Sequence, residues 1–430
     1  MLLAREWRAD FQTRLRQTYR CPVIAFTMNI PGPVKQSPLI RRSFRWGLER
    51  LEKALAGVVF RRVREEITGC EAYFAVEGSG LELKRICTAI EDDTPLGRLF
   101  DMDVTDADGT RLDRSLVAGK SRDCIVCGAP GRGCASRRLH TVVQLQAAAR
   151  KIMEDHFFTE DCRRVGELAV QSLLDEVHTT PKPGLVDRRN SGSHRDMALA
   201  TFAASARVLG PYFAECFRLG RAHSDPEEAF RHLRRAGIRG EAEMYRVTGG
   251  VNTHQGAIFT LGILCGSLGR LWTADAPLPP MEELLAQCAA LGKIALEDLE
   301  RLTIPATAGE MLYVERGLTG IRGEAAGGLP AVTGIGLPAY RMAREAGYSP
   351  NDAAAAALIH LVSKVEDSNL YHRGGPGGAA WAKREAEKLL PLPDMARIEA
   401  LDDGFIARNL SPGGCADLLA ATLFLAALYE

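Results

Sequence analysis

The stretch that decides the fold of the first part of the chain is Leu96–Val104, with the sequence LGRLFDMDV. Its polar and apolar residues alternate toward the end, and side chains of a β-strand point to opposite faces in turn. Asp101 and Asp103 are therefore expected on one face, with the apolar residues around them turned to a core. A turn signal, Asp106-Ala107-Asp108-Gly109, follows, and then the run Thr110–Val117. The pattern predicts a strand, a turn and a second strand.

The segments around this hairpin indicate a mixed α and β domain. Cys21–Ile30 and Ala72–Val76 have the composition of strands. Ser43–Val63 carries helical spacing, with a break expected at Gly57.

The second part of the chain is predicted to be helical throughout. The style of the sequence changes near Gln144–Cys162, and glycine- and proline-rich joints then separate segments with helical spacing. These segments are Arg163–His178, Ala198–Leu209, Pro226–Arg235, Ala257–Leu271, Met281–Leu302, Ala353–Lys364, Ala379–Leu389 and Ala416–Leu428. We predict two domains, an α+β domain over residues 1–155 and an all-α domain over residues 156–430.

The composition is that of an ordinary globular protein. The chain has 430 residues, 46% of them apolar, and lysines plus arginines balance aspartates plus glutamates at 54 each. This balance argues against a broad electrostatic grip on nucleic acid or on a membrane. The eleven cysteines, with no apolar signal segment at the start, indicate reduced thiols and a cytoplasmic location. The apolar runs Ala257–Leu264 and Leu418–Leu428 are too short to span a membrane.

The carboxylate pair Asp101 and Asp103 is suited to Mg²⁺ that carries substrate phosphates, because this cation prefers oxygen ligands. The alternative is a solvated strand face with a turn-capping aspartate. Several cations nearby are candidate phosphate clamps, with plain surface charge as the alternative for each. They are Lys35, Lys84, Arg98, Arg114 and Arg122.

A group of thiols follows the hairpin. Cys124 and Cys127 have the spacing of a tetrahedral zinc site, and Cys134 and His140 supply further zinc-type ligands at a looser spacing. A redox pair or buried thiols would also fit this pattern.

The first part resembles apo-citrate lyase phosphoribosyl-dephospho-CoA transferase over nearly all its length. The matching runs are Phe26–Gly32, Thr68–Ala72, Pro95–Val104 and Arg122–Cys127, together with Cys134 and His140. The resemblance implies transfer of a phosphoribosyl-dephospho-CoA group to a serine on the acyl carrier subunit of citrate lyase, with pyrophosphate leaving. It also implies a nucleotidyltransferase-like domain in which Asp101 and Asp103 act together.

Four polar corners flanked by glycine stand out in the second part. They are Thr179–Asp187 with Asn190, His194 and Asp196; Gly249–Gly256; Ser363–Gly375; and Asn409–Asp417. Each has an ordinary structural alternative: a tight helix entry, a surface carboxylate pair, a core histidine at 254, or an aspartate at 417 that complements a helix dipole. Four such corners in one helical domain indicate a cleft for phosphate and metal lined by helix ends.

This part resembles triphosphoribosyl-dephospho-CoA synthase from about Glu167 to Leu428. The matching runs are Leu174–Val177 with the Lys182 loop, Ser193–Met197, Asn252–Gly256, Gly320–Ala325, Glu366–Gly375 and Ser411–Asp417. The resemblance implies an all-helical enzyme that joins ATP to 3′-dephospho-CoA through a ribosyl bond and releases adenine. Its product is the donor that the first domain attaches, so the two domains make consecutive steps.

This chemistry needs a carboxylate beside the cation-like ribose carbon, a base for the attacking hydroxyl, and groups that hold the triphosphate. The predicted catalytic residues are Asp101, Asp103, Asp187, Glu366 and Asp367. The predicted Mg²⁺ ligands are Asp101, Asp103, Asp196 and Asp367. The predicted phosphate and nucleotide contacts are Lys35, Arg98, Arg122, Lys182, Asn252, His254, Lys364, Arg373, Gly413 and Gly414.

Two other interpretations remain at this point. The same chemistry could serve malonate decarboxylase, whose carrier uses the same prosthetic group, although the Asn-Ile-Pro-Gly run at Asn29–Gly32 and the Gly97–Asp103 segment favour citrate lyase. Alternatively, the chain could be a carrier-binding module fused to an inert nucleotide sensor. The many converging carboxylates argue against a sensor, which needs cations for phosphate.

Overall fold

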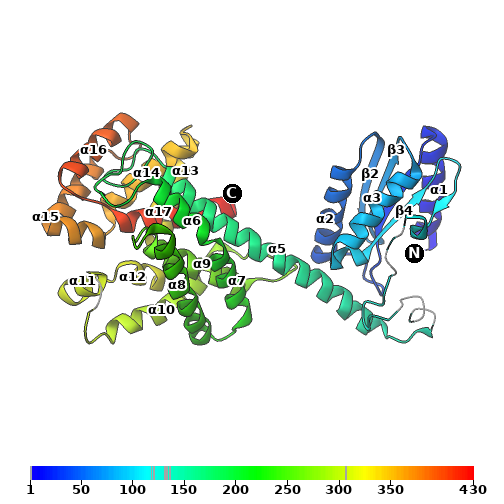
Figure 1. Ribbon diagram of the computed structural model, residues 1–430, viewed down its shortest axis with the longest axis horizontal. Coiled ribbons are helices and arrows are strands. Elements are labelled where there is room, and N and C mark those ends of the chain that lie inside the picture. The colour runs from blue at the N-terminus through cyan, green and yellow to red at the C-terminus, as the bar shows by residue number, and fades with distance from the viewer. Residues whose placement is uncertain (1, 118, 120–121, 130–133, 135–136, 306–307) are drawn as a thin grey trace. The chain divides into compact units, whose positions relative to one another are not determined.

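The computed structural model describes residues 2–117, 119, 122–129, 134, 137–305 and 308–430 (Figure 1). The chain forms two units. The first comprises Met1–Glu160 with Thr273–Ala276, and the second comprises Asp161–Trp272 with Pro277–Glu430. In the part of the chain that is described, no helix is long and apolar enough to cross a membrane.

The first unit is built on a five-stranded antiparallel sheet in the order β2-β3-β1-β4-β5. The strands are β1 Val23–Met28, β2 Val58–Glu66, β3 Gly69–Val76, β4 Phe100–Thr105 and β5 Arg111–Leu112. The helices are α1 Leu2–Tyr19, α2 Pro38–Ala54 and α3 Gly80–Asp93. The predicted α+β architecture is therefore confirmed at the level of a small antiparallel sheet with helices.

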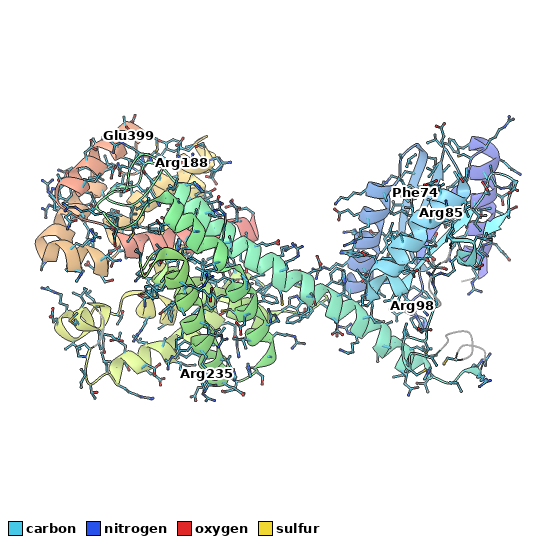
Figure 2. The ribbon with its side chains drawn as sticks, viewed as in Figure 1. Phe74, Arg85, Arg98, Arg188, Arg235 and Glu399 are labelled. Atoms are coloured by element: carbon cyan, nitrogen blue, oxygen red, sulfur yellow. The ribbon has the colours of Figure 1, made fainter. Side chains whose placement is uncertain are left out.

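Apolar side chains on both faces of the sheet hold these helices in place. Leu15 of α1 packs with Val23 and Tyr73 on one face. On the other face, Phe26 of β1 stacks on Phe44 of α2, with ring centroids 4.9 Å apart. The helix α3 lies with one side against the sheet. Its other side is exposed and carries Arg85 (Figure 2).

Three local predictions in this unit are wrong. Pro95–Leu99 is a turn of 3-10 helix, so the strand begins only at Phe100. After β5, the predicted second strand ends early, because Arg114–Val117 forms another 3-10 turn. The predicted helix Ser43–Val63 ends at Ala54, and the residues after Gly57 form β2, because they pair with β3 along its whole length.

The second unit is helical, as predicted. Its helices are α5 Val142–His178, which begins in the first unit, α6 Leu199–Val208, α7 Gly210–Ala222, α8 Pro226–Thr248, α9 Gln255–Leu271, α10 Met281–Glu300, α11 Ala308–Arg316, α12 Gly320–Ala326, α13 Leu337–Glu345, α14 Pro350–Lys364, α15 Ser368–Glu387, α16 Met395–Ala407 and α17 Gly413–Tyr429, with a π-helical turn at Val332–Gly336.

Three apolar helices, α9, α14 and α17, form the centre of this unit and are buried along most of their length. The helix α7 packs directly against α9, since a Cβ at Gly220 would lie 1.9 Å from the carbonyl oxygen of Gly266. Around this centre, the starts of α9, α15 and α17 come together, which positions the polar corners between the helices.

Candidate active sites

The two aspartates of β4 share one face of the sheet. The burial of β4 alternates, with Asp101 and Asp103 half-exposed and their apolar neighbours buried. They lie opposite Thr27 and Ala25 of β1. Burial and the charge of Asp103 raise the pKa of Asp101. The face predicted from the alternation is thus confirmed, and on it Asp103 forms an ion pair with Arg111.

Three arginines gather beside Asp101. Burial and the charges of Arg122 and Arg114 lower the pKa of Arg98, so the three guanidinium groups are neighbours. Arg122 donates to Glu91 at 2.7 Å and to the carbonyl oxygen of Phe100 at 3.1 Å. Clustered arginines with protein partners that an anion could replace are typical of phosphate sites.

The prediction that Lys84 clamps phosphate is wrong. Its side chain is buried, and its ammonium donates to the carbonyl oxygen of Met102 at 3.0 Å. Glu91 accepts from the Met102 N–H at 2.8 Å. These two side chains supply hydrogen-bond partners to the backbone of Met102, at a point of β4 that does not pair with β5. Lys84 therefore stabilises the sheet. Lys35 donates to the carbonyl oxygen of Ile30 instead, and burial and neighbouring arginines lower its pKa.

The predicted zinc ligands come together in the structure. The ligand atoms of Cys124, Cys127, Cys134 and His140 lie within 4.8 Å of one another. Cys127 Sγ is 3.5 Å from Cys134 Sγ and 3.3 Å from His140 Nε2. Thiolates in a tetrahedral zinc site lie about 3.8 Å apart, since Zn–S bonds are about 2.3 Å. Backbone N–H groups lower the pKa of Cys124, which favours the thiolate form that metals bind. The four residues therefore fit zinc.

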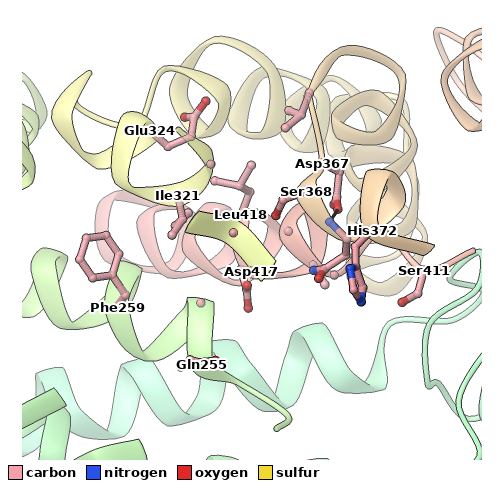
Figure 3. A pocket seen from close by; sticks show the side chains of 18 of the residues that line it. Gln255, Phe259, Ile321, Glu324, Asp367, Ser368, His372, Ser411, Asp417 and Leu418 are labelled. Carbon is pink, nitrogen blue, oxygen red and sulfur yellow. Dashed lines mark hydrogen bonds between the residues drawn. The ribbon is translucent and has the colours of Figure 1, made fainter. Parts of the chain in front are cut away.

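The helical unit contains a cavity of about 1110 Å³ (Figure 3). All four polar corners predicted from the sequence contribute to its lining. The predicted site residues that line it are Lys182, Asp196, Asn252, His254, Lys364, Glu366, Asp367, Arg373, Gly413 and Gly414. The hollow expected to join Lys182 to Asp367 is therefore present.

Asp187 is the exception, and the structure contradicts its predicted catalytic role. It is buried outside the lining of the cavity. Its Oδ2 accepts from the N–H of Lys182 at 3.0 Å, and its Oδ1 accepts from the N–H groups of Arg189 and Asn190 at 2.7 and 3.1 Å. The loop backbone therefore uses this carboxylate, which shapes the Lys182 corner.

Three helices begin at the cavity, and two of them are in direct contact. Figure 3 shows Asp367 and Ser368 at the start of α15 and Gln255 at the start of α9. Asp367 caps α15 and also accepts from the Cys415 N–H of α17 at 2.8 Å. A Cβ at Gly413 would lie 2.5 Å from the side-chain nitrogen of Asn369. The starts of α15 and α17 thus meet, which concentrates their positive dipole ends at one place.

Carboxylates converge at the same place. Burial, Glu176 and Asp367 together hold the pKa of Asp417 well above its usual range. Lys182 pairs with Glu176 at 2.6 Å, and both side chains are almost fully buried. The side chain of Asp417 points to the start of α9 (Figure 3), where a Cβ at Gly256 would lie 1.9 Å from its Oδ2.

Sequence reasoning gave no role to Glu176, and it left Asp417 as a residue that could merely complement a dipole. Their places in the sequence could have identified both residues. Glu176 lies shortly before the Pro-Lys-Pro-Gly corner, and Asp417 is the last residue of the corner that contains Pro-Gly-Gly.

Acids outnumber cations in the cavity lining. The seven acids are Glu176, Asp196, Glu241, Glu324, Glu366, Asp367 and Asp417, and the four cations are Lys182, Arg322, Lys364 and Arg373. Such a lining repels a free triphosphate and suits one that carries divalent cations, for which carboxylates are the usual ligands. The residues therefore fit Mg²⁺.

The rim of the cavity holds two of the predicted residues in ion pairs. Lys383 and Tyr371 bind the Glu366 carboxylate and, although burial opposes them, lower its pKa. Lys364 pairs with Glu387 at 3.2 Å. Both residues have exposed side chains, so these pairs are readily exchanged for substrate.

Elsewhere in the cavity lining, Arg373 orients a neutral histidine. Burial and the charge of Arg373 lower the pKa of His194 to about 4. Arg373 lies 3.2 Å from His194 Nδ1, and because a guanidinium can only donate, this nitrogen accepts. The hydrogen of His194 is then on Nε2, which lies 2.9 Å from Ser411 Oγ.

A further group of metal-ligand type lies apart from this cavity. His223, Glu228 and His232 place their ligand atoms within 4.8 Å of one another at the junction of α7 and α8. Sequence analysis did not identify this group, although Glu228 and His232 have the i, i+4 spacing of one helix face.

The comparisons with known proteins divide the chain at the same place as the structure. Residues 1–156 match the CitX family, described as apo-citrate lyase phosphoribosyl-dephospho-CoA transferase. Residues 162–430 match the CitG family, described as ATP:dephospho-CoA triphosphoribosyl transferase.

Relatives of full length are also found. The protein CitXG of Haemophilus influenzae is 33% identical over 445 aligned positions, covering 99% of this chain and 94% of its own. The protein CitXG of Leuconostoc mesenteroides subsp. cremoris is 31% identical, covering 99% of this chain and 95% of its own. A probable 2-(5''-triphosphoribosyl)-3'-dephosphocoenzyme-A synthase of Albidiferax ferrireducens is 41% identical over 62% of this chain and 91% of its own.

Proposed function

The chain belongs to the family of the CitXG proteins, in which a CitX unit precedes a CitG unit, and on that premise we propose that it makes and attaches the prosthetic group of citrate lyase. The helical unit joins ATP to 3′-dephospho-CoA and releases adenine. The first unit transfers the phosphoribosyl-dephospho-CoA group from this product to a serine of the acyl carrier subunit, and pyrophosphate leaves.

The observation that carries the first step is the acid-rich cavity at the helix starts. Its volume of about 1110 Å³ exceeds the range of about 300–1,000 Å³ for a site with one small ligand, which suits two nucleotide substrates side by side. The starts of α15 and α17 supply positive dipole ends for phosphate oxygens.

The acids of this cavity divide between metal binding and chemistry. Asp196 and Asp367 would hold Mg²⁺, and this cation would neutralise charge on the triphosphate. We assign to Glu176, whose carboxylate lines the same cavity, the stabilisation of positive charge on the ribose carbon as adenine departs. Asp187, whose oxygens accept from the backbone N–H groups of its own loop, is not available as the base for the attacking 2′-hydroxyl.

The second step uses the face of β4. We assign a nucleotidyltransferase-like role to Asp101 and Asp103, which would hold Mg²⁺, and to Arg98 and Arg122, which would bind phosphate oxygens. The antiparallel sheet with both carboxylates on one face supports this assignment. Cys124, Cys127, Cys134 and His140 would hold a structural zinc ion. None of the eleven cysteines, all of which the structure describes, forms a disulfide bond, which supports a cytoplasmic location.

The experiment that tests this function incubates the protein with ATP, dephospho-CoA and the apo-carrier of citrate lyase. Adenine is measured by chromatography, and the carrier is weighed by mass spectrometry. We expect adenine release only when dephospho-CoA is present, and a gain in carrier mass equal to one phosphoribosyl-dephospho-CoA group. If the carrier of malonate decarboxylase is modified in preference to that of citrate lyase, malonate decarboxylase is the enzyme that the protein serves. If no adenine is released, the proposal is refuted.

A further inference from the structure

His254 lines the cavity, and one nitrogen of its buried ring has no hydrogen-bond partner among the described residues. The residue is only 3% exposed. Its Nδ1 lies 2.8 Å from Ser205 Oγ, whereas its Nε2 has no hydrogen-bond partner in the part of the chain that the structure describes. Buried polar atoms are nearly always paired, because an unpaired one has lost its water without compensation. A bound ligand is the natural partner for this nitrogen.

The ring is held firmly in its orientation. Phe202 packs edge-on against it, with ring centroids 5.1 Å apart and an angle of 87° between the planes. The backbone N–H of His254 donates to the sulfur of Met244 at 3.3 Å, which fixes the main chain that carries the ring. With Nδ1 directed to Ser205, the ring has little freedom to turn, so the position of Nε2 is fixed before any ligand arrives.

Two hydroxyl groups decide which nitrogen carries the hydrogen. Thr253 Oγ1 donates to Ser205 Oγ at 2.8 Å, which leaves the single hydrogen of Ser205 for His254 Nδ1. Burial and the charge of Lys182 lower the pKa of His254 to about 3, so the ring is neutral at physiological pH. A neutral imidazole that accepts at Nδ1 carries its hydrogen on Nε2.

We propose that His254 Nε2 donates a hydrogen bond to a phosphate oxygen of the nucleotide in this cavity, and that Ser205 and Thr253 are positioning residues that set its tautomer. This inference rests on the proposed function and adds a specific contact to it. Phosphate is the acceptor that the surroundings favour, because His254 stands at the start of the 17-residue helix α9 and within the field of the Lys182 ammonium. A neutral donor also binds the triphosphate without repelling its Mg²⁺.

Measurements of nucleotide binding test whether the acceptor of the His254 hydrogen bond is a phosphate oxygen. Calorimetry would compare ATP, inorganic triphosphate and adenosine at constant Mg²⁺ for the wild type, His254→Ala and His254→Gln. We expect His254→Ala to weaken ATP and triphosphate about tenfold to a hundredfold, as for a hydrogen bond to a charged group, and to leave adenosine unchanged. Gln places an amide donor near the position of Nε2 and should restore most of the affinity. Equal weakening of adenosine and ATP would overturn the assignment to phosphate.

The tautomer is tested without any ligand. Protein labelled with ¹⁵N-histidine reports which ring nitrogen carries hydrogen, through long-range proton–nitrogen correlations. We expect the Nε2–H form in the wild type and a mixture of tautomers in Ser205→Ala, with weaker triphosphate binding in that variant. An Nδ1–H form in the wild type would overturn the proposal. Normal adenine release in the same sample would show that the proposed function stands nonetheless.

Discussion

Replacing Lys182 by methionine removes the cation from the buried ion pair beneath the cavity. The ammonium lies 2.6 Å from Glu176, and the two side chains are 2% and 5% exposed. Methionine keeps most of the apolar volume, so the perturbation is mainly electrostatic. Truncating one partner of a buried pair typically costs about 3–5 kcal/mol, because the other charge is left without compensation.

The structure limits this cost and gives it a pH dependence. The variant can take up a proton on the abandoned carboxylate, and protonating an ordinary glutamate costs about 3.7 kcal/mol at pH 7 and about 1.6 kcal/mol at pH 5.5. The folded variant then holds a proton that its unfolded chain releases, so its deficit in stability grows as the pH rises. We therefore expect a loss of about 3–4 kcal/mol at pH 7 that shrinks by more than half at pH 5.5.

Urea unfolding followed by far-UV circular dichroism, at both pH values, measures this loss. The double variant Lys182→Met/Glu176→Gln should regain stability to within about 1 kcal/mol of the wild type at pH 7, yet stay inactive in adenine release. Lys388→Met is the matched control, because its exposed pair with Glu385 contributes at most about 1 kcal/mol. A loss below about 1 kcal/mol, or one that does not change with pH, would refute a buried charged pair at this position.

Three further outcomes are expected. Gly256→Ala should abolish adenine release, because its Cβ would lie 1.9 Å from Asp417 Oδ2, whereas Gly377→Ala, with open space around it, should leave release unchanged; equal activity of both would contradict the tight contact. Asp101→Asn should stop carrier modification and spare adenine release, so a parallel loss of both activities would argue against separate sites. Cys127→Ser should lower the zinc content measured by mass spectrometry of metals, and an unchanged content would exclude that thiol as a ligand.

The spacing of apolar residues along the chain predicts a helix or strand correctly where the buried and exposed faces of that element differ clearly in polarity. Eight helices of the second unit and the alternation around Asp101 and Asp103 follow from such patterns, whereas α7, α11, α12, α13 and α16 were not predicted. The strand β2 was mistaken for helix because its exposed, arginine-rich sequence does not alternate cleanly. Its conformation is decided by pairing with β3, which no local pattern reveals.

Site residues could be predicted where they stand in a polar corner of the sequence. They could not be predicted where their role depends on burial in the folded protein. Lys182 and His254 stand in glycine- or proline-flanked corners, and both line the cavity. Glu176 looks like any acid on a helix surface, and only the return of the following loop buries it against Lys182. Asp187 and Lys84 are charged, as catalytic groups are. In the structure, however, both form hydrogen bonds with backbone groups.

The side chains that close the edge of β4 restrict how a carrier protein can reach the first unit. Many proteins recognise an extended peptide by adding it as a new strand to an open sheet edge. Here Lys84 and Glu91 already occupy the N–H and carbonyl of Met102, and an incoming strand would have to expel two buried charged groups. A carrier segment could therefore pair with β4 at Met102 only by displacing Lys84 and Glu91.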